Sequence, residues 1–123
     1  MLAGGCLSLL AAAAGTEHRL ATTGSILFWE DVHEPLYRLD RMLTQLRLSG
    51  TLANIHGMVV GRVEPADQGA SITDLHELLK ELNRACHWPI AAGCPSGHCE
   101  PNMTLGLGLP VRLRSSPGLL EMG

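Results

Sequence analysis

Two positions combine a chemically useful side chain with a backbone setting that could hold it in place. Glu30 directly follows the apolar run 25–29, which is typical of a buried strand. His98 follows the turn-forming stretch 93–97, rich in glycine and proline, which comes after a second short apolar run at 88–92. A carboxylate at a strand end can orient a histidine, and a histidine is the natural general base for a serine nucleophile. The pair is therefore a candidate acid and base, if the two strand ends meet.

Position alone leaves ordinary alternatives open for both residues. Glu30 could be a solvated acid at a strand end or a partner that caps a helix, because most such acids have no catalytic role. His98 could be a plain loop histidine, and the sequence holds five other histidines. Spacing does not bring the two residues together, so the elements that carry them must be considered next.

Alternation of strands and helices predicts an α/β layer with some parallel pairing. We expect helices over 7–14, from Pro35 to the closing Gly50, and from a cap at Ser71 or Thr73 through Leu82. The apolar faces of the last two helices comprise Leu36, Leu39, Leu43 and Leu46, and Ile72, Leu75, Leu78, Leu79 and Leu82. We expect strands over 25–29, 56–63 and 88–92, a loop over 64–70, one or two strands within 103–113, and frayed residues from Ser115.

Length and charge limit the class of protein. The 123 residues fit one short domain, 1–123, with a modest core built mostly from aliphatic side chains. The formal net charge of −3 argues against nucleic acid as a partner. No run of like charge indicates a tail or a membrane-binding patch.

The N-terminal stretch 1–15 is apolar and small-residue-rich, but it lacks the layout of a secretory signal. No Lys or Arg precedes the apolar run, and Cys6 comes before the run, whereas a lipoprotein cysteine would follow it. The run is also too short to span a bilayer. We therefore expect a small-residue helix packed closely against a neighbour, and a cytoplasmic protein with reduced thiols.

The cysteines raise an alternative, a small metal-binding domain. Cys86, Cys94 and Cys99 lie near His87 and His98. However, the spacing of four residues between Cys94 and Cys99 is loose, and adjacent His–Cys pairs are unusual ligands in structural zinc sites. We expect thiols that pack as small hydrophobic groups, with no metal and no cofactor.

Four stretches of the sequence resemble the LD-carboxypeptidases, the muramoyltetrapeptide carboxypeptidases. The most specific is the long stretch 25–46, SILFWEDVHEPLYRLDRMLTQL, which is similar to the central signature of that family. The others are Gly57-Met-Val-Val-Gly61-Arg62, the turn 93–98 with its Gly-x-Pro-x-Gly-His pattern, and Gly4-Gly-x-Leu7 with Gly15-Thr16. The resemblance covers nearly the whole chain, and it corresponds to the C-terminal domain of the family.

The resemblance implies a fold and an activity. The fold would be a small layered α/β domain of the swivelling β/β/α type, a mixed sheet with packed helices. The activity would be that of a serine peptidase without a metal, which removes the terminal D-alanine from the L,D-bond of murein tetrapeptides during cytoplasmic cell-wall recycling. Glu30 falls on the triad glutamate and His98 on the triad histidine. A relative in the same family detoxifies a peptide antibiotic, so the substrate is not fixed by the fold.

Departures from the family pattern affect packing and the nucleophile. Cys6 stands where the family usually has Asn, Ser96 replaces a common Phe, and Gly106 replaces a common Pro. The family's serine lies on a strand-to-helix elbow in an N-terminal domain that also supplies the oxyanion hole. None of the serines has that context; they are Ser8, Ser25, Ser49, Ser71, Ser96, Ser115 and Ser116.

The absence of a nucleophile leaves several readings. The chain could be part of a peptidase that is active only together with the nucleophile domain, and we expect no peptidase activity from it alone. It could instead be a non-enzymatic remnant that binds muropeptide or forms a homodimer through an exposed, partly apolar face. The metal-binding domain is the third reading.

Overall fold

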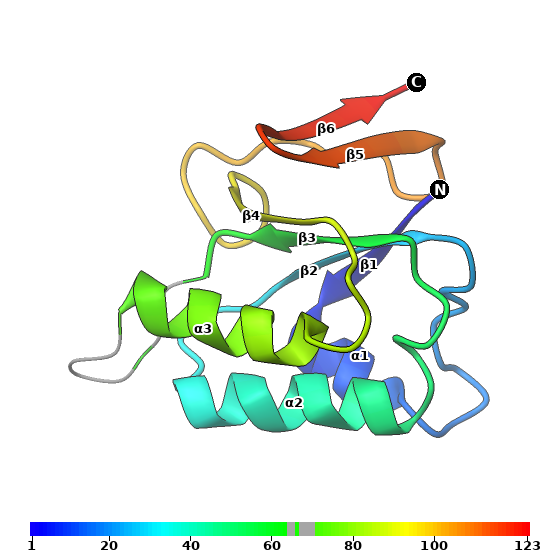
Figure 1. The fold of residues 1–123 in the computed structure, drawn as a ribbon, viewed down its shortest axis with the longest axis vertical. Helices are drawn as coiled ribbons and strands as arrows, with labels where there is room; N and C mark the ends of the chain where they lie inside the picture. The colour runs from blue at the N-terminus through cyan, green and yellow to red at the C-terminus, as the bar shows by residue number, and fades with distance from the viewer. Residues whose placement is uncertain (64–65, 67–70) are drawn as a thin grey trace.

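A computed structural model describes residues 1–63, 66 and 71–123, and it has three layers (Figure 1). A two-stranded antiparallel hairpin lies on one face of a four-stranded parallel sheet, and three helices cover the other face. The predicted α/β layering is confirmed, with the parallel and antiparallel strands in separate sheets. The predicted loop at 64–70 falls, apart from Ala66, outside the described residues.

The parallel sheet carries its strands in chain order. They are β1 (Leu2–Cys6), β2 (Ile26–Glu30), β3 (Gly57–Gly61) and β4 (Ile90–Cys94). A helix follows each of the first three strands and returns the chain across the same face. All four carboxyl ends therefore meet at one edge of the sheet, where open α/β sheets bind their ligands.

The helices begin and end at residues that physical rules favour. They are α1 (Leu7–Ala13), α2 (Leu36–Leu48) and α3 (Ile72–Asn83). Pro35 occupies the N-cap of α2, and Gly50, with a φ of 81°, follows its end. Ser71 caps α3 through a reciprocal capping box with Asp74, so Ser71 is the cap and Thr73 is not.

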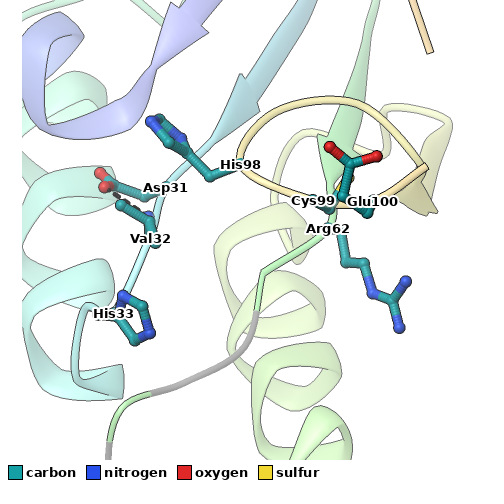
Figure 2. A pocket seen from close by; sticks show the side chains of 7 residues that line it. All are labelled: Asp31, Val32, His33, Arg62, His98, Cys99 and Glu100. Carbon is teal, nitrogen blue, oxygen red and sulfur yellow. Dashed lines mark hydrogen bonds between the residues drawn. The ribbon is translucent and has the colours of Figure 1, made fainter. Parts of the chain in front are cut away.

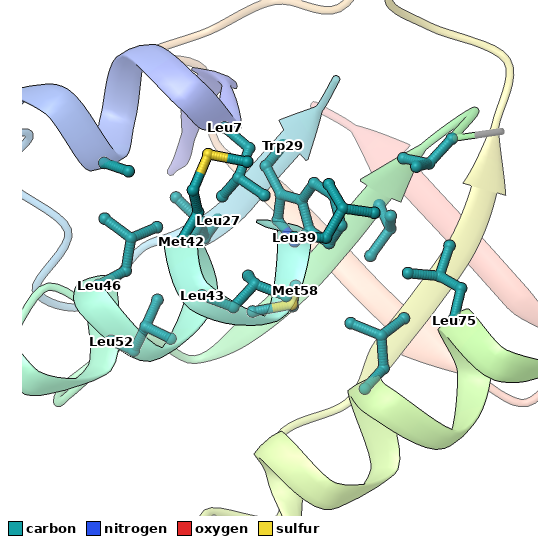
Figure 3. Close-up of a cluster of buried hydrophobic side chains, with 14 of the residues drawn as sticks. Leu7, Leu27, Trp29, Leu39, Met42, Leu43, Leu46, Leu52, Met58 and Leu75 are labelled. Carbon is teal, nitrogen blue, oxygen red and sulfur yellow. The ribbon is translucent and has the colours of Figure 1, made fainter. Parts of the chain in front are cut away.

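Alternation along β2 divides the core into two clusters. Leu27 and Trp29 point to the helices, where they pack with the buried face of α2 (Figure 3). Ile26 and Phe28 point to the hairpin. The predicted apolar face of α2 is confirmed for the buried Leu39, Leu43 and Leu46, with Met42 added. In α3 only Leu75 and Leu79 are buried, and the prediction was wrong for Ile72, which is 52% exposed.

The sequence patterns missed β1 and misplaced the bounds of β4. Residues 2–6 were expected to lead into a packed helix, yet they pair in register with β2. Their small side chains carry little strand propensity, and the pairing partner supplies the stability. The third predicted strand, expected at 88–92, is β4 at Ile90–Cys94, so it begins and ends two residues later and the turn before His98 is shorter than expected.

The C-terminus is ordered, which contradicts the expected fraying from Ser115. β5 (Val111–Ser115) and β6 (Gly118–Met122) form an antiparallel hairpin. Leu113 and Leu120 pack against the hairpin-side cluster, and this burial holds the hairpin in place. The stretch 103–110 is not a strand.

Candidate active site

Glu30 and His98 lie in direct contact at the carboxyl edge of the parallel sheet. The Nδ1 atom of His98 is 2.8 Å from Oε2 of Glu30, and the backbone N–H of His98 donates to the same oxygen at 3.2 Å. The Glu30 side chain is 7% exposed, whereas the imidazole is 58% exposed. A buried acid thus holds an accessible base, although 68 residues separate them in sequence.

The pair meets even though its two strands are not neighbours. β3 lies between β2, which ends in Glu30, and β4, which leads into the histidine turn. The carboxylate reaches across the end of β3, where Gly61 offers no side chain, and meets the turn from the other side. This arrangement could not be read from the sequence, because it depends on how residues 95–98 pass over the sheet edge.

The contact fixes the chemistry of the imidazole. The hydrogen bond to Glu30 and the charge of Glu30 raise the pKa of His98 above its ordinary value, and the charge of Asp31 adds to the effect while burial opposes it. An ionised carboxylate can only accept, so the neutral imidazole carries its proton on Nδ1. The lone pair on Nε2 is then available as a base.

Asp31 has a structural task at the same edge. Its side chain accepts the backbone N–H of Ser8 at 2.8 Å and that of Val32 at 2.9 Å. Cys6, the N-cap of α1, forms no cap with its own side chain, so Asp31 supplies a partner for the first turn of that helix. Only the adjacency of two acids after one strand could have pointed to this cap.

A cavity of about 280 Å³ opens beside the imidazole (Figure 2). Its lining comes from the segment after β2, the end of β3 and the histidine turn, and consists of Asp31, Val32, His33, Arg62, His98, Cys99 and Glu100. Figure 2 shows His98 and Asp31 on one side and Arg62, Cys99 and Glu100 on the other. The lining includes both acidic and basic side chains.

The thiols and serines of the described residues do not complete a site around His98. All four cysteines are free. Within residues 1–63, 66 and 71–123, no group of three or more His, Cys, Asp or Glu could hold a metal ion. Ser96 is buried in the histidine turn, and Ser8 contacts Cys6. In the same residues no helix is long and apolar enough to cross a membrane.

Curated proteins and solved structures match most of the chain. The murein tetrapeptide carboxypeptidase of Pseudomonas aeruginosa is 37% identical over 102 residues, which cover 82% of this chain and 33% of that protein. The crystal structure of muramoyltetrapeptide carboxypeptidase from Oxalobacter formigenes superimposes with a TM-score of 0.83 at 35% identity, covering 99% of this chain and 43% of that chain. The microcin C7 self-immunity protein MccF shares the fold, with a TM-score of 0.85 at 24% identity over 98% of this chain and 36% of that one.

The first three curated relatives show how much of a whole protein is present. The chain spans 38%, 37% and 40% of their lengths. The model of the LD-carboxypeptidase C-terminal domain matches residues 1–113, which include Glu30, His98 and the elements that join them. The chain belongs to the LD-carboxypeptidase C-terminal domain family.

Proposed function

We propose that Glu30 and His98 are the acid and the base of a Ser-Glu-His triad in a serine carboxypeptidase that releases the terminal D-alanine of murein tetrapeptides. The observation that carries the proposal is the 2.8 Å contact between Nδ1 of His98 and Oε2 of the buried Glu30. Relatives named as murein tetrapeptide and muramoyltetrapeptide carboxypeptidases supply the substrate class. Cytoplasmic cell-wall recycling is the setting that we propose.

In this mechanism each group has one task. Glu30 holds the imidazole with Nδ1 protonated and stabilises the imidazolium that forms. Nε2 of His98 takes the proton of a serine hydroxyl as that hydroxyl attacks the L,D-peptide carbonyl. The same proton then passes to the amine of the departing D-alanine, and a water repeats the sequence on the acyl-enzyme.

We further propose that these 123 residues do not hydrolyse the peptide by themselves. In the described part of the chain, leaving aside the side chain of Ser115, no serine hydroxyl is hydrogen-bonded to His98. The serine and the oxyanion hole would come from a separate nucleophile domain. Loss of a triad member alone leaves a residual rate that depends on the oxyanion hole and on binding, and without the oxyanion hole that rate is lost as well.

Reconstitution with a nucleophile domain tests the proposal. The chain is mixed with the separately produced nucleophile domain of an LD-carboxypeptidase, and D-alanine release from murein tetrapeptide is measured. We expect no release from the chain alone and release from the mixture. Glu30→Gln or His98→Ala should reduce the restored rate by on the order of 10⁴-fold, the loss typical of disabling a triad member.

Matched controls use a second close His–Glu pair, which lies on the surface. His18 and Glu17 are 3.7 Å apart on the surface, with side chains 83% and 87% exposed. Glu17→Gln and His18→Ala should leave the restored rate unchanged. Full activity in Glu30→Gln or His98→Ala, or D-alanine release by the chain alone, would contradict the assignment.

A second candidate is a peptidase of the antibiotic-immunity type. The microcin C7 self-immunity protein MccF of Escherichia coli is 27% identical over 90 residues, which cover 73% of this chain. Offering microcin C7 to the same mixture distinguishes the two substrates. Tetrapeptide binding or dimer formation with no hydrolysis of either substrate would instead indicate a non-enzymatic role.

A further inference from the structure

Two glycines from different elements close around the Glu30 side chain. A Cβ at Gly97, in the histidine turn, would lie 2.5 Å from Oε2 and 2.6 Å from Cγ of Glu30. A Cβ at Gly61, the last residue of β3, would lie 2.6 Å from Cβ of Glu30 and 2.6 Å from the carbonyl oxygen of Ser96. Real Cβ atoms do not approach other atoms this closely, so any side chain at either position displaces the acid, the turn or both.

The absence of side chains at these two glycines determines the position of the Glu30 carboxylate. Oε2 of Glu30 accepts both the backbone N–H and the ring nitrogen of His98, which requires it to lie within 3.2 Å of two atoms at once. Gly61 lets the side chain pass over the end of β3, and Gly97 lets the turn descend onto the carboxylate. A shift of a few tenths of an ångström weakens both hydrogen bonds together.

We propose that Gly61 and Gly97 are positioning residues that hold the Glu30 carboxylate on His98. The inference rests on the proposed role of the Glu30–His98 pair. Backbone freedom is a separate property of these glycines. Gly97 has a φ of 117°, whereas Gly61 lies in a strand outside the left-handed region, so an alanine at 61 acts through its side chain alone.

Two other glycines provide matched controls. Gly93 has a φ of 82° near the same turn, but nothing lies within 4 Å of a Cβ built on it. Gly57 starts the same strand as Gly61, and its Cβ would meet Leu113 at 2.9 Å and Pro89 at 3.1 Å, far from the acid. Gly93→Ala thus also places an alanine at a positive φ, and Gly57→Ala also places a crowded side chain in β3, but neither new side chain reaches Glu30.

The experiment follows the pH titration of the His98 ring by NMR in the 123-residue chain, which needs no peptidase activity. Each variant is first checked for the native circular dichroism spectrum. The charged or titratable groups that share the cavity with His98 are Asp31, His33, Arg62, Cys99 and Glu100, all unchanged in every variant. The Glu30→Gln variant provides the reference value, the pH midpoint of the His98 titration when residue 30 carries no carboxylate.

We expect Gly61→Ala and Gly97→Ala to lower the His98 midpoint towards the Glu30→Gln value, and the two controls to keep the wild-type midpoint. Wild-type midpoints in both Gly61→Ala and Gly97→Ala would overturn the inference, as would an equal fall in all four variants. If Gly97→Ala fails to fold, the comparison of the His98 midpoint in Gly61→Ala with that in Gly57→Ala tests the inference. A Glu30→Gln midpoint equal to the wild-type midpoint would instead show that Glu30 does not affect the titration of His98. That result would count against the proposed Glu30–His98 pair, whereas unchanged midpoints in the glycine variants alone would count only against the role of the glycines.

Discussion

At the residue scale, a carboxylate that is almost excluded from water holds an imidazole that is largely in contact with it. This difference in exposure fits the proposed roles, in which Glu30 is the fixed member of the pair and His98 is the base that exchanges protons. Strand-end position and turn composition made Glu30 and His98 candidates, and only the family resemblance implied triad roles for them. Their contact could not be predicted, because it depends on Gly61 and Gly97 leaving room for the carboxylate between β3 and the turn.

The raised pKa of His98 predicts how the stability of the fold changes with pH. Because the pKa in the folded state lies above the unfolded value, the pair stabilises the fold fully below about pH 6.5, the ordinary histidine value, and loses this contribution as pH rises through the folded pKa. Solvent screening keeps the effect small, since more than half of the imidazole is exposed.

Urea unfolding of wild type and His98→Ala between pH 5 and 9 measures this dependence. The advantage of wild type should be largest at the acidic end and decline towards the alkaline end. His18→Ala provides a control for the loss of an exposed histidine. An advantage that grows with pH would show that the sign is wrong.

At the element scale, the strand that the sequence patterns missed depends on one glycine. A Cβ at Gly4 would overlap the backbone carbonyl of Phe28 in β2, whereas nothing lies within 4 Å of a Cβ at Gly5. The two have similar φ angles, 153° and 158°. Glycine-rich segments have low strand propensity, so β1 forms because its backbone can approach β2 this closely.

Gly4→Ala should therefore destabilise the chain at or beyond the upper end of the range of about 1–3 kcal/mol that is typical of overpacking. Gly5→Ala carries a similar backbone strain without the overlap, so it should cost somewhat more than about 1 kcal/mol but clearly less than Gly4→Ala. Urea midpoints of the two variants decide the question. Equal losses would mean that backbone conformation, and not the contact with Phe28, sets the requirement at Gly4.

Elements with a strong periodic pattern were predicted well, and those held by tertiary contacts were not. The apolar face of α2 and the buried run of β2 carry their own signals. The C-terminal hairpin does not, because its strands are mostly exposed and only side chains such as Leu113 and Leu120 reach the core. Contact with β4, and not local propensity, keeps the hairpin ordered.

At the scale of the whole molecule, the parallel sheet has a hydrophobic cluster on each face, and the larger cluster lies between the sheet and the helices (Figure 3). A domain of this size has a stability of about 5–15 kcal/mol, so a single core cavity removes a large share of it. Leu43 is fully buried in α2, and Leu48, in the same helix, is 79% exposed. Truncating each leucine to alanine compares the stability lost at a buried position with that lost at an exposed position of the same helix.

We expect Leu43→Ala to cost about 2–5 kcal/mol and Leu48→Ala to stay within about 0.5 kcal/mol. Urea unfolding followed by tryptophan fluorescence and by circular dichroism measures both, and the two probes should coincide if the layers unfold together. A small loss in Leu43→Ala would mean that the cluster beneath the sheet repacks freely.

The space around Glu30 has a consequence for how sequences of this fold can diverge. Residues 30, 61 and 97 lie on three separate segments but share one small volume, so they cannot change independently. A side chain at 97 would meet Glu30, and one at 61 would meet both Glu30 and the carbonyl oxygen of Ser96, so neither position can gain a side chain without moving the carboxylate or the turn. Loss of the acid alone would free neither position, because the carbonyl oxygen of Ser96 still crowds residue 61 and a φ of 117° still favours glycine at residue 97.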